Sequence, residues 1–203
     1  EWYYIFKSYF IYNNNVPENI VICFATDQLR SSDIEFEEIQ RISKYVPLNR
    51  SGFVIDRENL SLAETIDFYL CKSLNIYANR ERLSKRVLNI LPKYRQLIRS
   101  INNNIPNQKI EREDSDYSHF TDMIQLADSV GCNILFCAMP IPKNYSINDE
   151  IISTLKMSKY CKLYDFRDSN IFSDIHFLDG YHLNEFGATI FTTHLIDSLQ
   201  MAN

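Results

Sequence analysis

Hydrophobic positions along the chain fall into two patterns, short unbroken apolar runs and longer stretches with helical periodicity. Unbroken apolar runs rich in β-branched and aromatic residues are typical of strands buried on both faces of a parallel sheet. Two runs have this character, NIVICFAT at 19–26 and CNILFCAM at 132–139, and CKLYDF at 161–166 is a third candidate strand. A shorter run, GFVI at 52–55, is compatible with a short strand. We predict strands at these positions.

The stretches between the apolar runs mostly show the spacing of amphipathic helices. Ser61 and Glu64 form the Ser-x-x-Glu pattern of a capping box, which predicts the start of a helix. Pro92 predicts a kink in a later helix. The apolar side of the capped helix is expected to carry Leu62, Ile66, Tyr69, Leu70 and Tyr77. Helices are predicted over about residues 2–12, 31–45, 61–77, 83–100, 117–131 and 148–158, and from about Asn184 onward.

Alternating helices and apolar strands predict an α/β fold with a mainly parallel sheet. We expect one domain over residues 1–203, with residues 101–116 forming a polar loop because they lack any apolar period. In such sheets the functional groups lie on loops at the carboxyl ends of the strands. Those loops are predicted at residues 25–32, 140–148 and 168–182.

Composition and charge narrow the classes of function. The apolar share of 45% and the charged share of 23% are those of an ordinary globular protein. A net charge of -5 and the lack of a basic stripe argue against a nucleic-acid partner. No apolar stretch approaches the roughly 18 residues of a membrane span, so we expect no transmembrane segment. No signal peptide is visible, which leaves a cytoplasmic or a cell-envelope location open.

The first residues of the chain bear on its completeness. The sequence starts at Glu1 rather than at a methionine, inside a predicted helix, so we expect the domain to be N-terminally incomplete. The opening EWYYIFKSYFIY is crowded with aromatic side chains. Such a segment could lie on a membrane surface, but a helix buried against a sheet is the favoured interpretation.

Cysteine and histidine usage indicates neither disulfides nor a metal. The five cysteines are an odd number without Cys-x-x-Cys spacing, so buried free thiols are expected at all of them. His176 and His182 could join Asp174 and Asp179 around a metal ion, but no further ligand follows by spacing. We expect no metal and no cofactor. The cysteines are Cys23, Cys71, Cys132, Cys137 and Cys161.

The segment DGYHLNEFG at 179–187 holds the clearest candidate chemistry. An aspartate three residues before a histidine on a tight loop can accept a hydrogen bond from one ring nitrogen. That bond fixes the tautomer, so the other nitrogen can act as a general base for a hydroxyl nucleophile. On the alternative interpretation, Asp179 caps a turn and His182 packs against the last helix.

The pattern Asp-x-x-His-Leu-Asn-x-x-Gly, followed by an amphipathic helix, resembles the C-terminal block of the SGNH (GDSL-like) hydrolases. It is most similar to the branch with polysaccharide O-acetyltransferases. Weaker likeness at residues 17–29 and 118–142 extends the resemblance over about residues 17–200. The resemblance implies a three-layer flavodoxin-like fold and a Ser-His-Asp triad in which His182 is the base and Asp179 orients it. It also implies an esterase or O-acyltransferase whose substrate is a small-molecule or glycan ester of a carbohydrate or lipid.

Two departures from the family pattern stand out. The Gly-Asp-Ser block that supplies the family's nucleophile and first strand is not found, so the nucleophile is expected outside this sequence. Ser31 and Ser32 are weaker candidates within it. The family's Asn-Asp pair is replaced by Asp27 and Gln28, which we assign to the oxyanion region. An ionised Asp27 would repel the oxyanion, and losing one donor costs roughly 3 kcal/mol of transition-state stabilisation.

The missing block leaves alternatives for the whole protein. The upstream part could have been cropped, which is the interpretation we favour, or a second fragment could supply the missing strand. A degenerate hydrolase that serves binding or assembly is the competing class of function. The other histidines are weaker candidates. His176 with Asp174 could mimic the dyad, His194 is expected to be buried on the last helix, and His119 is expected to be solvated or to cap a helix.

Overall fold

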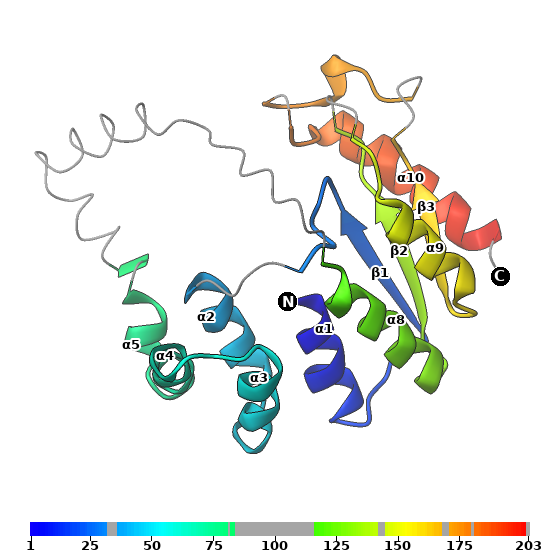
Figure 1. Ribbon diagram of the computed structural model, residues 1–203. Helices are drawn as coiled ribbons and strands as arrows, with labels where there is room; N and C mark the ends of the chain where they lie inside the picture. Colours follow the sequence, from blue (N-terminus) through cyan, green and yellow to red (C-terminus); the bar gives the residue numbers. More distant parts are fainter. Residues whose placement is uncertain are drawn as a thin grey trace, which may run out of the picture. The chain divides into compact units, whose positions relative to one another are not determined.

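The computed structural model describes residues 1–31, 36–80, 82–83, 116–141, 145–167, 171–179 and 181–201 (Figure 1). Its contacts divide the chain into two compact units. The helical unit comprises residues 1–15 and 32–115, and the sheet unit comprises residues 16–31 and 116–203. Each unit is compact in its own right. The expectation that residues 1–203 form a single domain stays a prediction.

The sheet unit contains a three-stranded, all-parallel sheet in the order β1-β2-β3. The strands are β1 (Asn19–Phe24), β2 (Asn133–Ala138) and β3 (Cys161–Asp165). The three long apolar runs are therefore strands, as the sequence predicts, and the fold class is α/β with a parallel sheet. The register places Cys23 beside Cys137, and Cys137 beside Tyr164.

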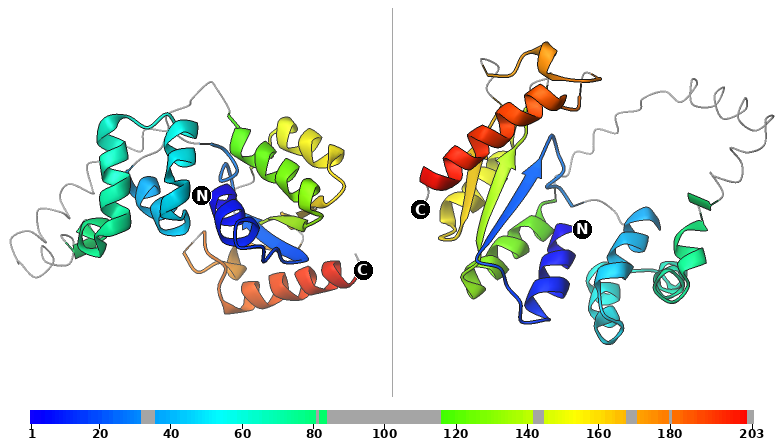
Figure 2. Two further views of the ribbon diagram at one scale, coloured as in Figure 1. Left: turned by 90° about the horizontal axis from the view of Figure 1, so that it is seen from below. Right: turned by 180° about the vertical axis from the view of Figure 1, so that it is seen from behind.

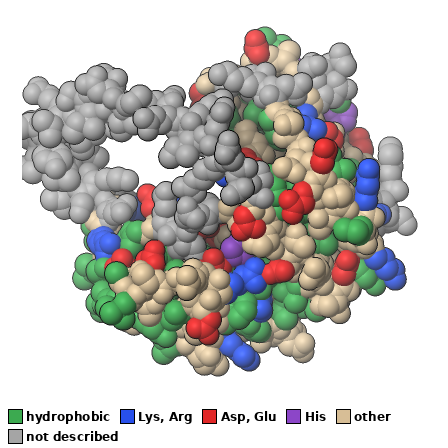
Figure 3. All heavy atoms as spheres, in the orientation of Figure 1, with side chains coloured by type: hydrophobic (Ala, Val, Ile, Leu, Met, Phe, Trp, Pro, Cys, Tyr) green, Lys and Arg blue, Asp and Glu red, His purple; other side chains and the backbone are tan. Residues whose placement is uncertain are grey.

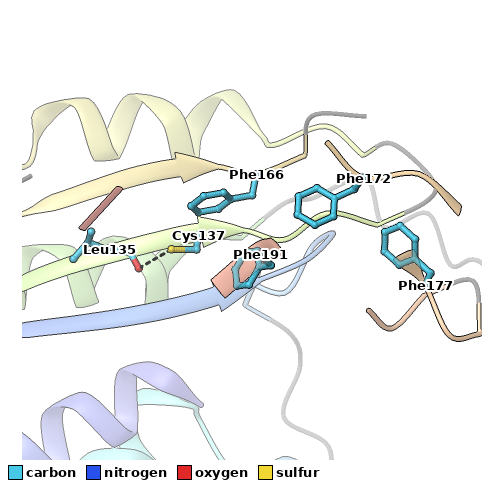
Figure 4. Close-up of a cluster of buried hydrophobic side chains, with 6 residues drawn as sticks. All are labelled: Leu135, Cys137, Phe166, Phe172, Phe177 and Phe191. Atoms are coloured by element: carbon cyan, nitrogen blue, oxygen red, sulfur yellow. Dashed lines mark hydrogen bonds between the residues drawn. The ribbon is translucent and has the colours of Figure 1, made fainter. Parts of the chain in front are cut away.

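Helices cover both faces of this sheet. Helices α8 (Ser118–Val130) and α9 (Asp149–Met157) lie on one face, and α10 (Glu185–Met201) lies on the other (Figure 2). On the first face, Phe120 of α8 packs edge-on against Phe136 of β2, with ring centroids 5.1 Å apart. The face toward α10 holds a cluster of buried side chains from β2, the following loops and the helix (Figure 4), namely Leu135, Cys137, Phe166, Phe172, Phe177 and Phe191.

Two helix ends in the sheet unit follow from single residues. Gly131 adopts φ 70°, a left-handed conformation that glycine tolerates, and it ends α8 at the predicted point. Asn148 begins α9 because its side-chain oxygen accepts the Glu150 N–H at 2.8 Å. Both boundaries match the sequence prediction to within a residue or two.

Strand β1 is less covered than β2. Val21 is 40% exposed and Cys23 is also exposed, whereas their register partners Leu135 and Cys137 are buried on the face toward α10. The cover on that face therefore extends over β2 but not over β1. This corrects the expectation that all cysteines are buried, which holds for the other four but not for Cys23.

The described part of the helical unit confirms helical structure within three predicted stretches, 2–12, 31–45 and 61–77, and it confirms the capping box. Ser61 accepts the Glu64 N–H, and the Glu64 carboxylate accepts the Ser61 N–H at 2.8 Å. The elements are α1 (Trp2–Ile5), the π-helical turn η1 (Phe6–Ile11), α2 (Phe36–Tyr45), the 3-10 helix η2 (Leu48–Arg50), α3 (Ser51–Arg57), α4 (Leu62–Ser73) and α5 (Asn75–Ala78).

Two expectations for this unit were wrong. GFVI belongs to helix α3, with Val54 buried, because a four-residue apolar run fits one side of a short helix as well as a strand. Helix α4 buries Phe68 and Cys71 instead of the predicted apolar side, of which Leu62, Ile66 and Tyr69 are exposed. The predicted helix at 83–100 with its kink at Pro92 and the loop 101–116 lie outside the described residues, apart from Leu83 and Asp116.

The surface of the described residues shows mixed charge. On the face drawn in Figure 3, acidic and basic side chains are interspersed, and no continuous basic patch is visible among the described residues (Figure 3). None of the helices in the described ranges combines the length and the apolar character that a membrane crossing requires.

Candidate functional site

A tight loop after β3 carries the two residues that the sequence singles out. The chain forms the short 3-10 helix η3 (Asp174–His176) and then folds back through an antiparallel bridge between Phe177 and Leu183. Inside the bridge, the Leu178 N–H donates to the carbonyl of His182 at 2.7 Å. The loop lies beyond the carboxyl end of the sheet, where the alternation of strands and helices predicts functional groups (Figure 1).

Asp179 and His182 form a hydrogen-bonded pair in this loop. Nδ1 of His182 lies 2.7 Å from Oδ2 of Asp179. An ionised carboxylate only accepts hydrogen bonds, so Nδ1 carries the proton and Nε2 carries the lone pair. The second carboxylate oxygen of Asp179 is also hydrogen-bonded. Its Oδ1 accepts the backbone N–H groups of Tyr181 at 3.1 Å and of His182 at 2.8 Å.

These hydrogen bonds stabilise the charged form of Asp179. The backbone N–H of His182, its imidazole and the backbone N–H of Tyr181 together lower the pKa of Asp179 to about 2. The carboxylate is therefore ionised throughout the neutral range. It can hold the imidazole in one tautomer and stabilise the imidazolium that forms when Nε2 accepts a proton.

The imidazole is open to solvent. The side chain of His182 is 73% exposed and that of Asp179 is 51% exposed. Among the described residues, Nε2 of His182 has no hydrogen-bond partner, so this nitrogen is available to a group from outside. The alternative in which His182 packs against the last helix does not fit this exposure. Asp179 does cap the turn, but it does so while it also orients His182.

The rest of the motif fixes the loop against helix α10. The Asn184 side chain accepts the Gly187 N–H at 2.9 Å and donates to the Ile175 carbonyl at 2.7 Å. It therefore caps α10, as predicted, and ties the helix to η3. A Cβ atom on Gly187 would lie 2.4 Å from the His176 carbonyl oxygen, so only glycine fits there without a shift of the backbone.

His176 is a structural residue rather than part of a second dyad. It is buried, and its Nδ1 accepts the Ser173 N–H at 2.9 Å. Its ring lies 6.1 Å from that of Phe172 and 5.4 Å from that of Phe186. Among the described residues, no hydrogen bond joins His176 to Asp174. Phe186 itself is 62% exposed.

His194 is exposed, so the expectation that it is buried on α10 was wrong. The helix packs against the sheet along a narrow stripe of side chains spaced four residues apart, Phe191, Leu195 and Leu199. His194 lies beside this stripe and faces solvent. No hydrogen bond joins the His194 side chain to the described residues of the loop that holds Asp179 and His182.

The turn after β1 holds the two residues assigned to the oxyanion region. Thr26 adopts φ 54°, a conformation that β-branched residues rarely take. Oε1 of Gln28 accepts the Ala25 N–H at 2.9 Å and closes the turn. Gln28 is therefore used to hold this strained turn in place.

Asp27 is engaged by neighbouring side chains. Its Oδ1 accepts the Tyr117 hydroxyl at 3.0 Å, and its Oδ2 lies 3.0 Å from the guanidinium of Arg30. The Arg30 charge offsets the negative charge that the sequence places at this position. Asp27 itself can supply no hydrogen bond to an oxyanion while it is ionised.

Ser31 lies beside a histidine that the sequence did not connect with it. Its Oγ is 3.0 Å from Nδ1 of His119 and accepts the His119 backbone N–H at 3.3 Å. The second contact provides an acceptor for a backbone N–H in the first turn of α8, where His119 lies. The residues are far apart in the chain, so no local pattern could reveal their contact. Ser32 lies outside the described residues.

Tyr145 is a further residue of this sheet edge that the sequence analysis missed. Its hydroxyl donates to the Met139 carbonyl at 3.0 Å and lies 3.4 Å from the Phe24 carbonyl. Burial raises the pKa of Tyr145 to about 12, and the neighbouring Tyr181 contributes in the same direction. Tyr145 therefore joins the ends of β1 and β2 and lies near the loop that holds His182.

Arg167 completes the edge on the β3 side. Its guanidinium forms two hydrogen bonds with the Asp165 carboxylate, at 2.7 and 2.6 Å, and these lower the pKa of Asp165. It also donates to the Tyr145 carbonyl and lies 4.9 Å from the centroid of the Tyr145 ring. The cation is thus paired, and its main effect is to fix the loop after β2.

No group of three or more His, Cys, Asp or Glu side chains among the described residues is placed to hold a metal ion. Comparison of the chain with protein-family models, with curated proteins and with solved structures found no match.

Proposed function

We propose that the chain is an SGNH-like esterase or O-acyltransferase domain that acts on an ester of a carbohydrate or lipid. His182 serves as the general base, and Asp179 orients it. The proposal rests on one observation above all, the 2.7 Å hydrogen bond from Nδ1 of His182 to Asp179 in an exposed loop beyond the carboxyl end of a parallel sheet. This geometry leaves Nε2 free to take a proton from a hydroxyl group.

In the proposed reaction the nucleophile is a serine hydroxyl that lies outside this sequence. Nε2 of His182 takes its proton while the serine oxygen attacks the ester carbonyl. The imidazolium then gives the proton to the departing alcohol, and an acyl-serine remains. Water completes hydrolysis, or an acceptor hydroxyl completes acyl transfer, with His182 again serving as the base. Asp179 stays ionised and stabilises the imidazolium in both steps.

Strand β1 fits this proposal as an inner strand of a larger sheet. Among the described residues it pairs only with β2, and Val21 and Cys23 are exposed on one of its faces. In the flavodoxin-like arrangement of the SGNH fold, the strand that precedes the nucleophile would lie next to β1. A second fragment or an upstream segment would then supply both that strand and the serine.

A non-catalytic binding or assembly domain is the second candidate function. The observation in its favour is Asp27, which stands where the family has an oxyanion donor and which binds Arg30 and Tyr117 instead. On this alternative the Asp179–His182 pair stabilises the loop and takes no part in catalysis. The two candidates differ in whether the full-length protein turns over an ester with His182 as the base.

The test uses the natural full-length gene product and the 203-residue chain side by side, with an aryl acetate as substrate. The full-length protein should turn the ester over, and His182→Gln should reduce kcat by roughly 10⁴-fold. His194→Gln is the matched control, since His194 is an exposed histidine of the same unit outside the proposed site. No turnover by the full-length protein would support the binding domain instead, and turnover that survives His182→Gln would contradict the role of His182 as the base.

The same experiment locates the nucleophile. The 203-residue chain should show negligible turnover, and a serine-directed phosphonate should label the full-length protein at a serine outside residues 1–203. Ser31→Ala should leave this labelling intact, because Ser31 is bound to His119 at the start of α8. Robust His182-dependent turnover by the short chain, lost in Ser31→Ala, would instead place the nucleophile at Ser31.

A further inference from the structure

Two cysteines lie side by side on neighbouring strands of the sheet. Cys23 on β1 and Cys137 on β2 are register partners. Neighbouring strands are about 4.8 Å apart, and a disulfide spans Cα atoms about 4.4–6.8 Å apart. Register partners also point to the same face of the sheet. A covalent bond between them would need little movement of the backbone.

The two thiols differ in exposure. Cys23 is exposed, whereas Cys137 is fully buried in the cluster beneath α10, together with Phe166 and Phe191 (Figure 4). A reagent from solvent can therefore reach the sulfur of Cys23 and not that of Cys137. The exposure of Cys23 follows from the incomplete cover of β1 on this face.

The two thiols also differ in acidity. The hydrogen bond from the Cys137 thiol stabilises a thiolate at Cys23 and lowers the pKa of Cys23 to about 7, although partial burial opposes this. The same hydrogen bond and burial raise the pKa of Cys137. Near neutral pH a substantial fraction of Cys23 is thus a thiolate, whereas Cys137 stays protonated.

The other three cysteines have none of these properties. Cys71, Cys132 and Cys161 are buried, and burial raises the pKa of each. They are expected to be slow toward oxidants because the thiolate is the reactive form. They provide internal controls for the reactivity of Cys23.

We propose that Cys23 and Cys137 form a redox-active pair that reacts with hydroperoxides. The Cys23 thiolate attacks the terminal peroxide oxygen, the O–O bond breaks, and the departing alkoxide or hydroxide takes up a proton. Cys23 is then a sulfenic acid. The Cys137 sulfur attacks the Cys23 sulfur, a disulfide forms, and the sulfenic hydroxyl leaves as water with the Cys137 proton. In sum, two thiols and one peroxide give a disulfide, an alcohol or water, and water.

The proposal is tested on the 203-residue chain with hydrogen peroxide near neutral pH. Mass spectrometry should show the loss of two hydrogen atoms, and peptide mapping should join the peptides of Cys23 and Cys137. In Cys137→Ser, a dimedone adduct should accumulate at Cys23, because the sulfenic acid is no longer resolved. Cys161→Ser, which removes a buried thiol of the same sheet, should still form the disulfide.

A second measurement holds even if Cys137→Ser disturbs the fold. In the unaltered chain, the alkylation rate of Cys23 by iodoacetamide should rise with pH through a midpoint near 7. The proposal is overturned if peroxide gives no Cys23–Cys137 linkage, or if Cys23 is alkylated with an ordinary thiol midpoint of about 8.5. His182→Gln should leave all of these results unchanged, because this chemistry is independent of the proposed ester site.

Discussion

At the scale of single residues, Asp179 has the most clearly determined environment in the candidate site. Its pKa is lowered to about 2, below the ordinary value of roughly 3.9 that it has in the unfolded chain. Its charged form therefore stabilises the folded loop at pH values above the unfolded pKa. That contribution is lost as the pH falls toward 2, where the carboxylate is protonated in both states.

This environment can be measured by following the Asp179 carboxyl signal in an NMR pH titration. The unaltered chain should titrate near pH 2. In His182→Ala the pKa should rise but stay below its ordinary value, because the N–H groups of residues 181 and 182 still donate to Oδ1. A titration unchanged by the substitution would show that the imidazole does not bind Asp179.

Gly187 gives a second test at this scale. In Gly187→Ala the new methyl group would meet the His176 carbonyl at 2.4 Å, so we expect a loss of about 1–3 kcal/mol in the free energy of unfolding. Gly52→Ala is the control, since its Cβ would meet nothing within 4 Å. That substitution lies in α3 and should be neutral or stabilising. Urea unfolding of both variants decides the matter, and equal effects would contradict the packing described for the loop.

Residue environments were the least predictable part of the chain. The sequence correctly paired Asp179 with His182, because an aspartate and a histidine three residues apart can meet within one turn. It gave the wrong burial for Cys23 and His194, since burial depends on which helix covers which strand. The contact between Ser31 and His119 joins two loops and leaves no local signal.

At the scale of elements, the predictions succeeded where the sequence has a long, mostly apolar run or a helix-capping residue. The runs at 19–26, 132–139 and 161–166 became β1, β2 and β3, and their parallel pairing confirms the prediction that NIVICFAT and CNILFCAM share one parallel sheet. The run at 52–55 is too short to show a period, and it is part of α3. Helix α4 has apolar residues on more than one side, so the sequence could not select the buried face.

The capping box allows an element-scale measurement. Ser61→Ala removes the hydroxyl that accepts the Glu64 N–H, so the free energy of unfolding should fall by about 0.5–2 kcal/mol. Ser153→Ala is the matched control, because Ser153 is inside α9 and its hydroxyl bonds only to the Glu150 carbonyl. Its replacement should be neutral or slightly stabilising. A Ser61→Ala effect no larger than that of Ser153→Ala would show that the cap contributes little in solution.

At the scale of the whole molecule, the alternation of strands and helices predicted where the site should lie. The loop with Asp179 and His182 does lie beyond the carboxyl end of the sheet. The supporting contacts of Tyr145 and Arg167 could not be predicted, because they join the ends of separate strands. The identity of the family and the location of the nucleophile remain predictions.

The central claim is that Asp179 orients His182 for ester chemistry, and one comparison tests it most directly. The kcat/KM of the natural full-length gene product for an acetyl ester is measured with Asp179→Asn and with Asp174→Asn, an exposed aspartate of η3 outside the dyad. We predict a drop of roughly 10⁴-fold for Asp179→Asn, because the wrong tautomer of His182 is then favoured, and no change for Asp174→Asn. Equal kcat/KM values for the two variants, or full activity in Asp179→Asn, would contradict the account.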